Sequence, residues 1–292
     1  MIYVKEARYY QKLKDNSTHC LLCPHQCHIK VGEMGLCNTR ENKEGRLLAL
    51  NYEEVASLAL DPIEKKPLRR FHPGSTILSA GTYGCNMFCP YCQNYELSRA
   101  KPGKLRTNHI SASKLVNIAR QEKSKGNIGL AFTYNEPTVW YEYVLEAAKL
   151  AKENNLLVVL VTNGCIEEEP LRELLPYVDA MNIDLKSINP TTYRKTLKGD
   201  ICATKRTIEL AVQSTHVEIT TLMVPGLNDS EGEFDETLSY LAGISRNLPL
   251  HISRFFPRYK MNHIPATDTD AIYAAMRRAK KKLKYVYSGN LK

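Results

Sequence analysis

The sequence predicts an α/β fold built from repeated strand and helix units. From residue 75 onward, short apolar runs rich in β-branched residues alternate with segments of helical period. Each run is followed at its carboxyl end by glycine or polar residues. In parallel α/β folds the active site is built from the residues at these strand ends. The composition, with 43% hydrophobic and 24% charged residues among 292, is that of an ordinary globular protein.

Six apolar runs and a short seventh mark the expected strands. They are residues 77–80, 128–133, 157–162, 180–185, 217–223 and 252–256, followed by 285–287. The helical segments between them include residues 112–123, 139–153 and 234–245. Six or seven units are too few for a closed barrel of eight strands.

The part of the chain before these units has a different character. Residues 1–60 are rich in cysteine and irregular after a short helical pattern near residues 4–13, and residues 61–74 hold three prolines and several basic residues. We therefore expect a Cys-rich N-terminal segment at 1–60, a linker at 61–74 and a core domain at 75–292.

The chain is basic, with 40 Lys and Arg against 31 Asp and Glu, which permits binding to acidic partners or nucleic acid. The densest basic run, residues 277–284, follows a helical pattern whose other face is apolar, and no RNA-binding signature accompanies it. We expect a solvated helix face there, with contact to an acidic protein or to RNA as the alternative. Nucleic acid is not the expected partner.

The cellular setting bears on the cysteines. No stretch approaches the roughly 20 apolar residues that span a bilayer, and the start of the chain lacks an apolar signal core. We expect a cytoplasmic protein without a membrane partner. Because disulfides are rare in a reducing compartment, the nine cysteines indicate metal binding or redox chemistry.

Three cysteines form a C-x3-C-x2-C motif just after the first strand of the repeat: Cys85, Cys89 and Cys92. Soft thiolates select iron-sulfur clusters, zinc or Cu(I). A closed zinc site needs four ligands, and no fourth Cys or His follows in this loop. On a [4Fe-4S] cube, the iron without a protein ligand can bind a substrate or cofactor. Gly81 and Gly84 would allow the close backbone approach that such a cluster needs.

Four further cysteines follow the spacing C-x2-C-x3-C-x9-C in the N-terminal segment: Cys20, Cys23, Cys27 and Cys37. Four thiolates in a loop-rich segment fit a closed tetrahedral zinc site or a second, auxiliary iron-sulfur cluster; a segment without metal is the third alternative. His25 and His28 could replace a cysteine ligand, although such histidines are more often surface groups. Cys165 and Cys202 are expected to be isolated packing residues.

Residues 84–94, Gly-Cys-Asn-Met-Phe-Cys-Pro-Tyr-Cys-Gln-Asn, resemble the signature of radical S-adenosylmethionine (SAM) enzymes, in the branch that contains the pyruvate formate-lyase activating enzymes. The resemblance implies a partial (β/α)6, TIM-like barrel. It also implies a catalytic [4Fe-4S] cluster on the three cysteines of this motif, with SAM on the open iron. One-electron cleavage would give methionine and a 5′-deoxyadenosyl radical that abstracts hydrogen from a substrate. A reductant such as flavodoxin or ferredoxin would supply the electron.

The N-terminal cysteines, together with Gly32, Gly35 and Arg40, are similar to the signature of radical SAM enzymes of the AmmeMemoRadiSam system. Residues 251–257 and 285–290 resemble that family too. The resemblance implies Memo-type and AMMECR-type partner proteins and a protein or small-molecule substrate that the sequence does not disclose. The alternatives are an activating enzyme for a glycyl-radical enzyme, an RNA-modifying radical SAM enzyme and, from a different class, a non-catalytic iron-sulfur or zinc scaffold.

The resemblance further assigns residues to SAM. Asn135 and Glu136 correspond to a motif, usually Gly-Gly-Glu-Pro, that holds the SAM ammonium, for which carboxylate and carbonyl oxygens are suitable acceptors. Asp184 and Lys186, which alternation puts on one strand face, resemble the pair that frames the SAM carboxylate and ribose. The competing interpretations are a helix cap for Glu136 and an ion pair that only closes the barrel end.

Two further positions complete the expected SAM site. Tyr91 would place its backbone against the adenine, and His251 matches a family position near SAM, although a lone strand histidine is often structural. Activating enzymes place an Asp just before Thr162 that helps to bind a monovalent cation. This chain has Val161 there, so we do not expect that cation site.

Overall fold

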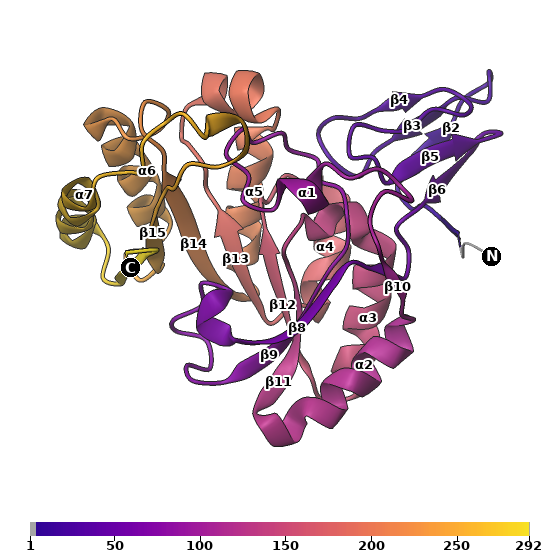
Figure 1. Ribbon diagram of the computed structural model, residues 1–292, viewed down its shortest axis with the longest axis horizontal. Coiled ribbons are helices and arrows are strands. Elements are labelled where there is room, and N and C mark those ends of the chain that lie inside the picture. Colours follow the sequence, from indigo (N-terminus) through magenta and orange to yellow (C-terminus); the bar gives the residue numbers. More distant parts are fainter. Residues whose placement is uncertain (1–3, 292) are drawn as a thin grey trace.

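The computed structural model describes residues 4–291, and its centre is one eight-stranded sheet in the order β16-β15-β14-β13-β12-β11-β9-β8 (Figure 1). Seven strands run parallel, and the first, β8, is antiparallel to β9. Their bounds are β8 (Ser57–Pro62), β9 (Thr76–Gly81), β11 (Asn127–Phe132), β12 (Leu157–Thr162), β13 (Ala180–Asp184), β14 (His216–Met223), β15 (Leu250–Arg254) and β16 (Val286–Gly289). The expected strands are confirmed, including the short seventh.

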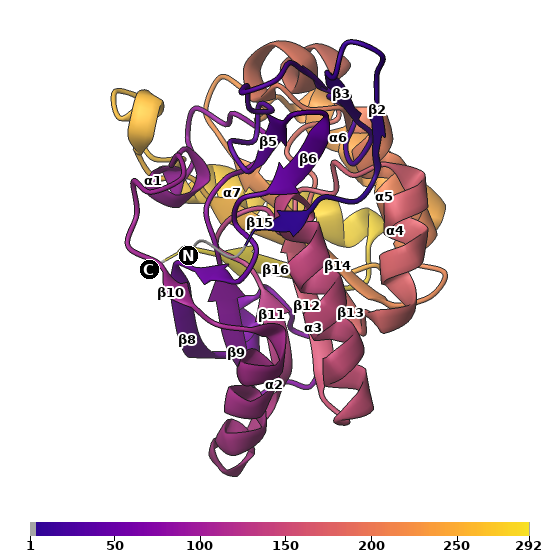
Figure 2. The same ribbon diagram turned by 90° about the vertical axis from the view of Figure 1, so that its right-hand side faces the viewer.

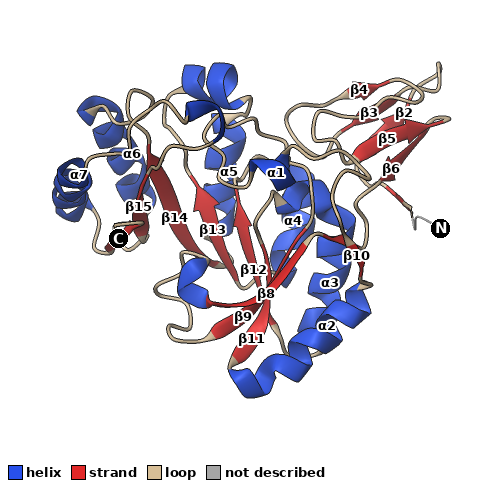
Figure 3. Cartoon of the chain, in the orientation of Figure 1, coloured by secondary structure: helices blue, strands red, loops and turns tan. Residues whose placement is uncertain are grey.

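The sheet is open. Within residues 4–291, β8 and β16 form its two edges and do not pair with each other, which confirms a partial barrel. In Figure 3 the helices lie on the outer side of the curved sheet. Their bounds are α1 (Tyr95–Ser98), α2 (Ala112–Gln121), α3 (Tyr141–Glu153), α4 (Glu168–Leu174), α5 (Ile201–Ala211), α6 (Glu231–Ile244) and α7 (Thr269–Lys282). Short helical turns are η1 (Ile63–Lys65), η2 (Glu122–Lys125), η3 (Pro137–Trp140), η4 (Leu175–Tyr177), η5 (Thr192–Leu197) and η6 (Tyr259–Met261).

The last helix explains the basic run. In α7 the residues Ile272, Ala275 and Ala279 are buried, whereas the lysines of its final turn are exposed or half-buried. Cations near a helix C-terminus are stabilised by the helix dipole. The structure thus gives the run a solvated helix face, as expected. Among the described helices, none is both long and apolar enough to cross a bilayer.

The N-terminal segment forms small antiparallel sheets, so the helix expected near residues 4–13 is wrong. Residues there pair instead as strands, and Tyr9 between them adopts φ +55°, which interrupts a right-handed helix. The strands are β1 (Lys5–Glu6), β2 (Tyr10–Lys12), β3 (Thr18–Cys20), β4 (His28–Ile29), β5 (Arg40–Lys43) and β6 (Arg46–Ala49), with a separate pair β7 (Glu54–Val55) and β10 (Asn108–His109). Figures 1 and 2 show the N-terminal sheets beside α3.

Strand β8 crosses the expected boundary between residues 60 and 61. All six of its residues pair with β9, so this part of the chain belongs to the main sheet. Residues 63–74, which we name the strap, connect β8 to β9 and are hydrogen-bonded to Asn182 on β13 and Glu218 on β14. The division into 1–60, 61–74 and 75–292 stays a prediction.

Glu218 on β14 joins the strap to the sheet. Its carboxylate is fully buried and accepts hydrogen bonds from the backbone N–H groups of Arg69 (3.0 Å) and Arg70 (2.7 Å). The imidazoles of His216 (2.9 Å) and His251 (2.5 Å) are its other partners. Burial opposes ionisation, but these four hydrogen bonds outweigh it and lower the pKa of Glu218 to about 2.

Replacing this carboxylate tests its contribution. Because the pKa of Glu218 lies below its ordinary value of 4.5, the ionised form stabilises the fold above that pH, and the contribution disappears as the pH falls towards 2. Glu218→Gln should lower the free energy of unfolding by about 3 kcal/mol at pH 7, and by less at acidic pH, in urea titrations. The exposed Glu236→Gln on α6 is the control. Equal losses in both variants at every pH would contradict this role.

Candidate active site

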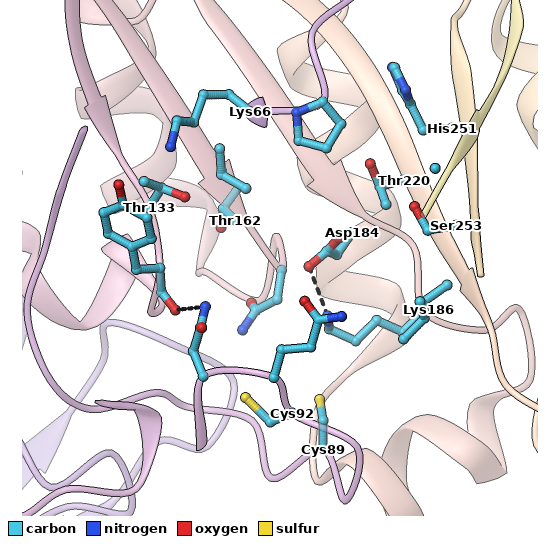
Figure 4. A pocket seen from close by; sticks show the side chains of 18 of the residues that line it. Lys66, Cys89, Cys92, Thr133, Thr162, Asp184, Lys186, Thr220, His251 and Ser253 are labelled. Carbon is cyan, nitrogen blue, oxygen red and sulfur yellow. Dashed lines mark hydrogen bonds and ion pairs between the residues drawn. The ribbon is translucent and has the colours of Figure 1, made fainter. Parts of the chain in front are cut away.

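The carboxyl ends of the parallel strands surround a cavity of about 1070 Å³ (Figure 4). The loop after β9, the ends of β11 to β15 and part of the strap contribute to its wall. All the predicted residues of the catalytic motif and of the SAM site line it: Cys85, Cys89, Tyr91, Cys92, Asn135, Glu136, Asp184, Lys186 and His251. The structure therefore brings together residues that lie up to 166 positions apart in the sequence (251 − 85).

The three cysteines suit a cluster better than a single ion. Figure 4 shows Cys89 and Cys92 at the same end of the cavity. Burial raises the pKa of Cys85 and raises that of Cys89 to about 11, so both thiols are protonated until a metal displaces the proton. Three thiols without a fourth ligand beside a large cavity fit a [4Fe-4S] cluster that keeps one iron open.

Asn135 holds the loop that leads into Cys85. Its side-chain oxygen accepts from the backbone N–H of Thr82 at 3.0 Å, and its amide nitrogen donates to the carbonyl of Gly84 at 3.0 Å. The amide thus connects the end of β11 to the entry of the cysteine loop. An Asn is suited to this position because it offers both a donor and an acceptor.

Glu136 is almost completely buried, and its carboxylate already accepts three hydrogen bonds. They come from the backbone N–H groups of Thr138 (3.0 Å) and Asn163 (2.8 Å) and from the hydroxyl of Thr162 (2.7 Å). The expected helix cap is therefore present at η3, and the same carboxylate also ties β11 to β12. Burial raises the pKa of Glu136 against the effect of these bonds.

Asp184 and Lys186 form an ion pair, with Oδ2 and Nζ 2.8 Å apart (Figure 4). Such a pair was the alternative to a role in SAM binding. Both side chains nevertheless line the cavity. Burial by itself would lower the pKa of Lys186, but the carboxylate of Asp184 raises it well above its ordinary value. The pair therefore presents a fixed cation and a half-exposed anion to whatever occupies the cavity.

His251 and Tyr91 have structural contacts of their own. The His251 imidazole bonds to Glu218 and stacks on Tyr287 with ring centroids 5.2 Å apart. The Tyr91 side chain is buried, and its hydroxyl has no hydrogen-bond partner within the described part of the chain. Both residues line the cavity; the His251 side chain is held by hydrogen bonding and stacking, and the Tyr91 ring is part of the buried core.

Sequence reasoning missed a group of three bonded side chains that line the cavity: Asp61, Lys66 and Tyr134. Figure 4 shows Lys66 at the end of the cavity opposite Cys89 and Cys92. Asp61 Oδ2 lies 2.8 Å from the Lys66 ammonium and accepts from the Tyr134 hydroxyl at 2.6 Å. The Lys66 ammonium also lies 4.7 Å from the centre of the Tyr134 ring. Tyr134 has φ +72°, a strained conformation for a residue other than glycine. No local sequence signal marks this group, because β8 and the strap place it only in the folded chain.

The remaining cysteines separate into two kinds. Cys165 is buried and Cys202 is exposed on α5, and neither lines the cavity. The four N-terminal cysteines line a second, much smaller cavity, which is considered below.

Comparison with known proteins identifies the class. The model of the Radical SAM superfamily matches residues 80–241, which is more than half of the chain. The chain therefore belongs to the radical SAM superfamily and is an enzyme that uses SAM cleavage rather than a non-catalytic scaffold. Membership implies a [4Fe-4S] cluster and SAM as cofactors.

Among its relatives, the chain is 40% identical to the uncharacterized protein MJ0808 of Methanocaldococcus jannaschii, over 99% of this chain and 86% of that one. It is 26% identical to the pyruvate formate-lyase-activating enzyme of Clostridium pasteurianum over 56% of this chain and 67% of that enzyme. With the GTP 3′,8-cyclase of Clostridium botulinum it shares 26% identity over 50% of this chain and 47% of the cyclase.

The fold also resembles solved structures. The crystal structure of Streptococcus suis SuiB bound to S-adenosylmethionine matches with a TM-score of 0.57 at 13% identity, over 73% of this chain and 52% of that chain. A radical SAM methyltransferase from Sphaerobacter thermophilus matches with a TM-score of 0.52 at 16% identity, over 75% of this chain and 67% of that chain. At these identities the likeness concerns the fold alone.

The close approach at Gly84 can be tested with two glycines. Gly84 (φ +90°) and Gly103 (φ +72°) both adopt the left-handed backbone conformation. A Cβ on Gly84 would lie 2.6 Å from the Cys37 carbonyl oxygen and would also clash with Thr39. A Cβ on Gly103 would meet nothing within 4 Å. Gly103→Ala should cost about 1 kcal/mol of stability. Gly84→Ala should cost more and also displace the cysteine loop, which would lower the iron content after anaerobic reconstitution. Equal stability and iron content in the two variants would contradict this view.

Proposed function

We propose that this enzyme uses a [4Fe-4S] cluster on Cys85, Cys89 and Cys92 to cleave SAM reductively and to abstract hydrogen from a substrate. The observation that carries the proposal is three half-buried thiols, without a fourth Cys or His in the same loop, at the wall of a cavity lined by carboxylate acceptors and by the paired ammonium of Lys186. When bound, the reduced cluster supplies one electron that breaks the bond between the SAM sulfur and C5′, leaving methionine and a 5′-deoxyadenosyl radical. A flavodoxin or ferredoxin is the proposed reductant.

The protein's own contribution is to orient SAM at this wall. The Glu136 carboxylate, which lines the cavity, suits the SAM ammonium, and Lys186 offers a charge-assisted donor to the SAM carboxylate. Asp184 accepts from the ribose hydroxyls, the backbone at Tyr91 lies against the adenine, and His251 borders the same space. Asn135 acts indirectly, because its amide positions the cysteine loop.

A substrate then lies between SAM and the group Asp61, Lys66 and Tyr134 at the other end of the cavity. These side chains are paired with one another, so they provide a fixed polar wall. Holding substrate and radical together in one cavity limits reaction with water.

The partners follow from the sequence resemblance. The N-terminal cysteine motif favours a role in the AmmeMemoRadiSam system, with Memo-type and AMMECR-type partners. The similarity to the pyruvate formate-lyase-activating enzyme of Clostridium pasteurianum favours the second candidate, an activating enzyme for a glycyl-radical partner. A glycyl-radical EPR signal on a co-encoded partner after incubation with SAM and reductant would decide for the second. Salt-dependent RNA binding would instead favour an RNA-modifying enzyme.

Radical formation is tested directly by product analysis. The anaerobically reconstituted protein should form 5′-deoxyadenosine from SAM in the presence of dithionite, as measured by liquid chromatography. Cys89→Ala removes one cluster ligand and should abolish the product, while Cys202→Ala, at an exposed cysteine outside the cavity, should keep it. A fully loaded cluster that yields no 5′-deoxyadenosine would refute the proposal.

Lys186→Met tests the SAM site separately from the cluster. Loss of one charge-assisted hydrogen bond should weaken SAM binding about 10- to 100-fold in calorimetric titrations, with the iron content unchanged. Lys65→Met is the matched control, because Lys65 borders the same cavity with an exposed ammonium. Unchanged affinity in Lys186→Met would remove this residue from the SAM site.

A further inference from the structure

The four N-terminal cysteines gather around a cavity of their own. Although Cys37 follows Cys27 by ten positions, Cys20, Cys23, Cys27 and Cys37 all line one cavity of about 20 Å³. Hydrogen bonds between backbone groups draw the segment together, from Cys20 N–H to the Cys27 carbonyl (2.9 Å) and from Gly35 N–H to the Arg40 carbonyl (2.8 Å).

We propose that these four cysteines bind a single zinc ion in a closed site that is separate from the catalytic motif. A cavity of this volume has room for about one water molecule, and so for one ion but not for a cube of four irons and four sulfides. The catalytic cysteines, in contrast, border a cavity of about 1070 Å³. Zinc with four thiolates and no open position is the usual arrangement of a structural site.

Two histidines lie near the four cysteines. His25 lines the small cavity, and its Nε2 lies 2.6 Å from the carbonyl oxygen of Asn86. His28 does not line it, and its Nε2 lies 2.9 Å from the Ser17 hydroxyl. Four thiols complete a tetrahedral zinc site by themselves, so the proposed ligand set is the four cysteines.

Arg40 supplies a hydrogen-bond donor that such a site can use. Four thiolates around Zn²⁺ carry a net charge of about −2, which is costly to bury without donors to the sulfurs. The Arg40 side chain is 1% exposed and lines the same cavity. Its two terminal nitrogens each donate to Glu142 at 2.9 Å, but its Nε has no partner within residues 4–291. A metal-bound thiolate would accept from this unpaired donor.

The sulfurs are not yet at metal-binding distance, because within the described residues no three of the potential ligands converge on one ion. Zinc would replace the thiol protons and draw the sulfurs to about 2.3 Å from the metal. The site would then stabilise the catalytic loop, since His25 contacts Asn86 and Gly84 lies against Cys37 and Thr39.

The test uses the full chain with Cys85, Cys89 and Cys92 all replaced by Ala, so its outcome does not depend on radical chemistry. Elemental analysis should find about one zinc ion per chain and no iron. Adding Cys23→Ser and Cys37→Ser should remove the zinc, whereas adding Cys202→Ser should not.

A spectroscopic measurement guards against variants that fail to fold. Cobalt should replace zinc in the chain that retains the four N-terminal cysteines and give the thiolate charge-transfer and tetrahedral ligand-field bands of a four-thiolate site. A chain without bound zinc, or a cobalt spectrum without thiolate bands, would overturn the proposal. Iron and sulfide in place of zinc would overturn it too, in favour of an auxiliary cluster.

Discussion

The cysteine loop has little secondary structure of its own, and buried polar contacts from other elements hold it in place. Asn135 at the end of β11 binds both Thr82 and Gly84, so the entry to the loop is fixed by the neighbouring strand. On its other side the loop packs against the N-terminal segment, where the absence of a side chain on Gly84 lets the Cys37 carbonyl approach. The position of the catalytic thiols thus depends on two parts of the chain that precede and follow them.

The cavity combines several buried charges, and each is compensated within the protein. Asp184 pairs with Lys186, Asp61 pairs with Lys66, and Glu136 accepts three hydrogen bonds. An unpaired buried charge would cost several kcal/mol, so pairing is what allows these groups to persist before a ligand binds. A cofactor then meets a wall whose donors and acceptors are already oriented, which lowers the cost of ordering the site on binding.

Much of the fold could be predicted because its signals are local. The parallel strands are buried on both faces and therefore appear as apolar runs, and each carboxyl end carries its functional residues directly after the run. Asp61 and Lys66 could not be found in this way, since β8 pairs with β9 across a strap that looks like a linker. The helix expected near residues 4–13 failed because pairing with distant strands outweighed a weak local pattern.

The sequence by itself determined the class of chemistry, because residues 84–94 resemble the radical SAM signature, and the family match over residues 80–241 confirms that class. It also determined the order of strands and helices, which depends on the periodicity of apolar residues. Only the tertiary structure decided which side chains face the cavity and which partners they have: that Glu136 caps a helix, that His251 is held by Glu218, and that four N-terminal cysteines share one small space. These contacts join residues far apart in the chain, and burial and hydrogen bonding between such residues leave no periodic trace in the sequence.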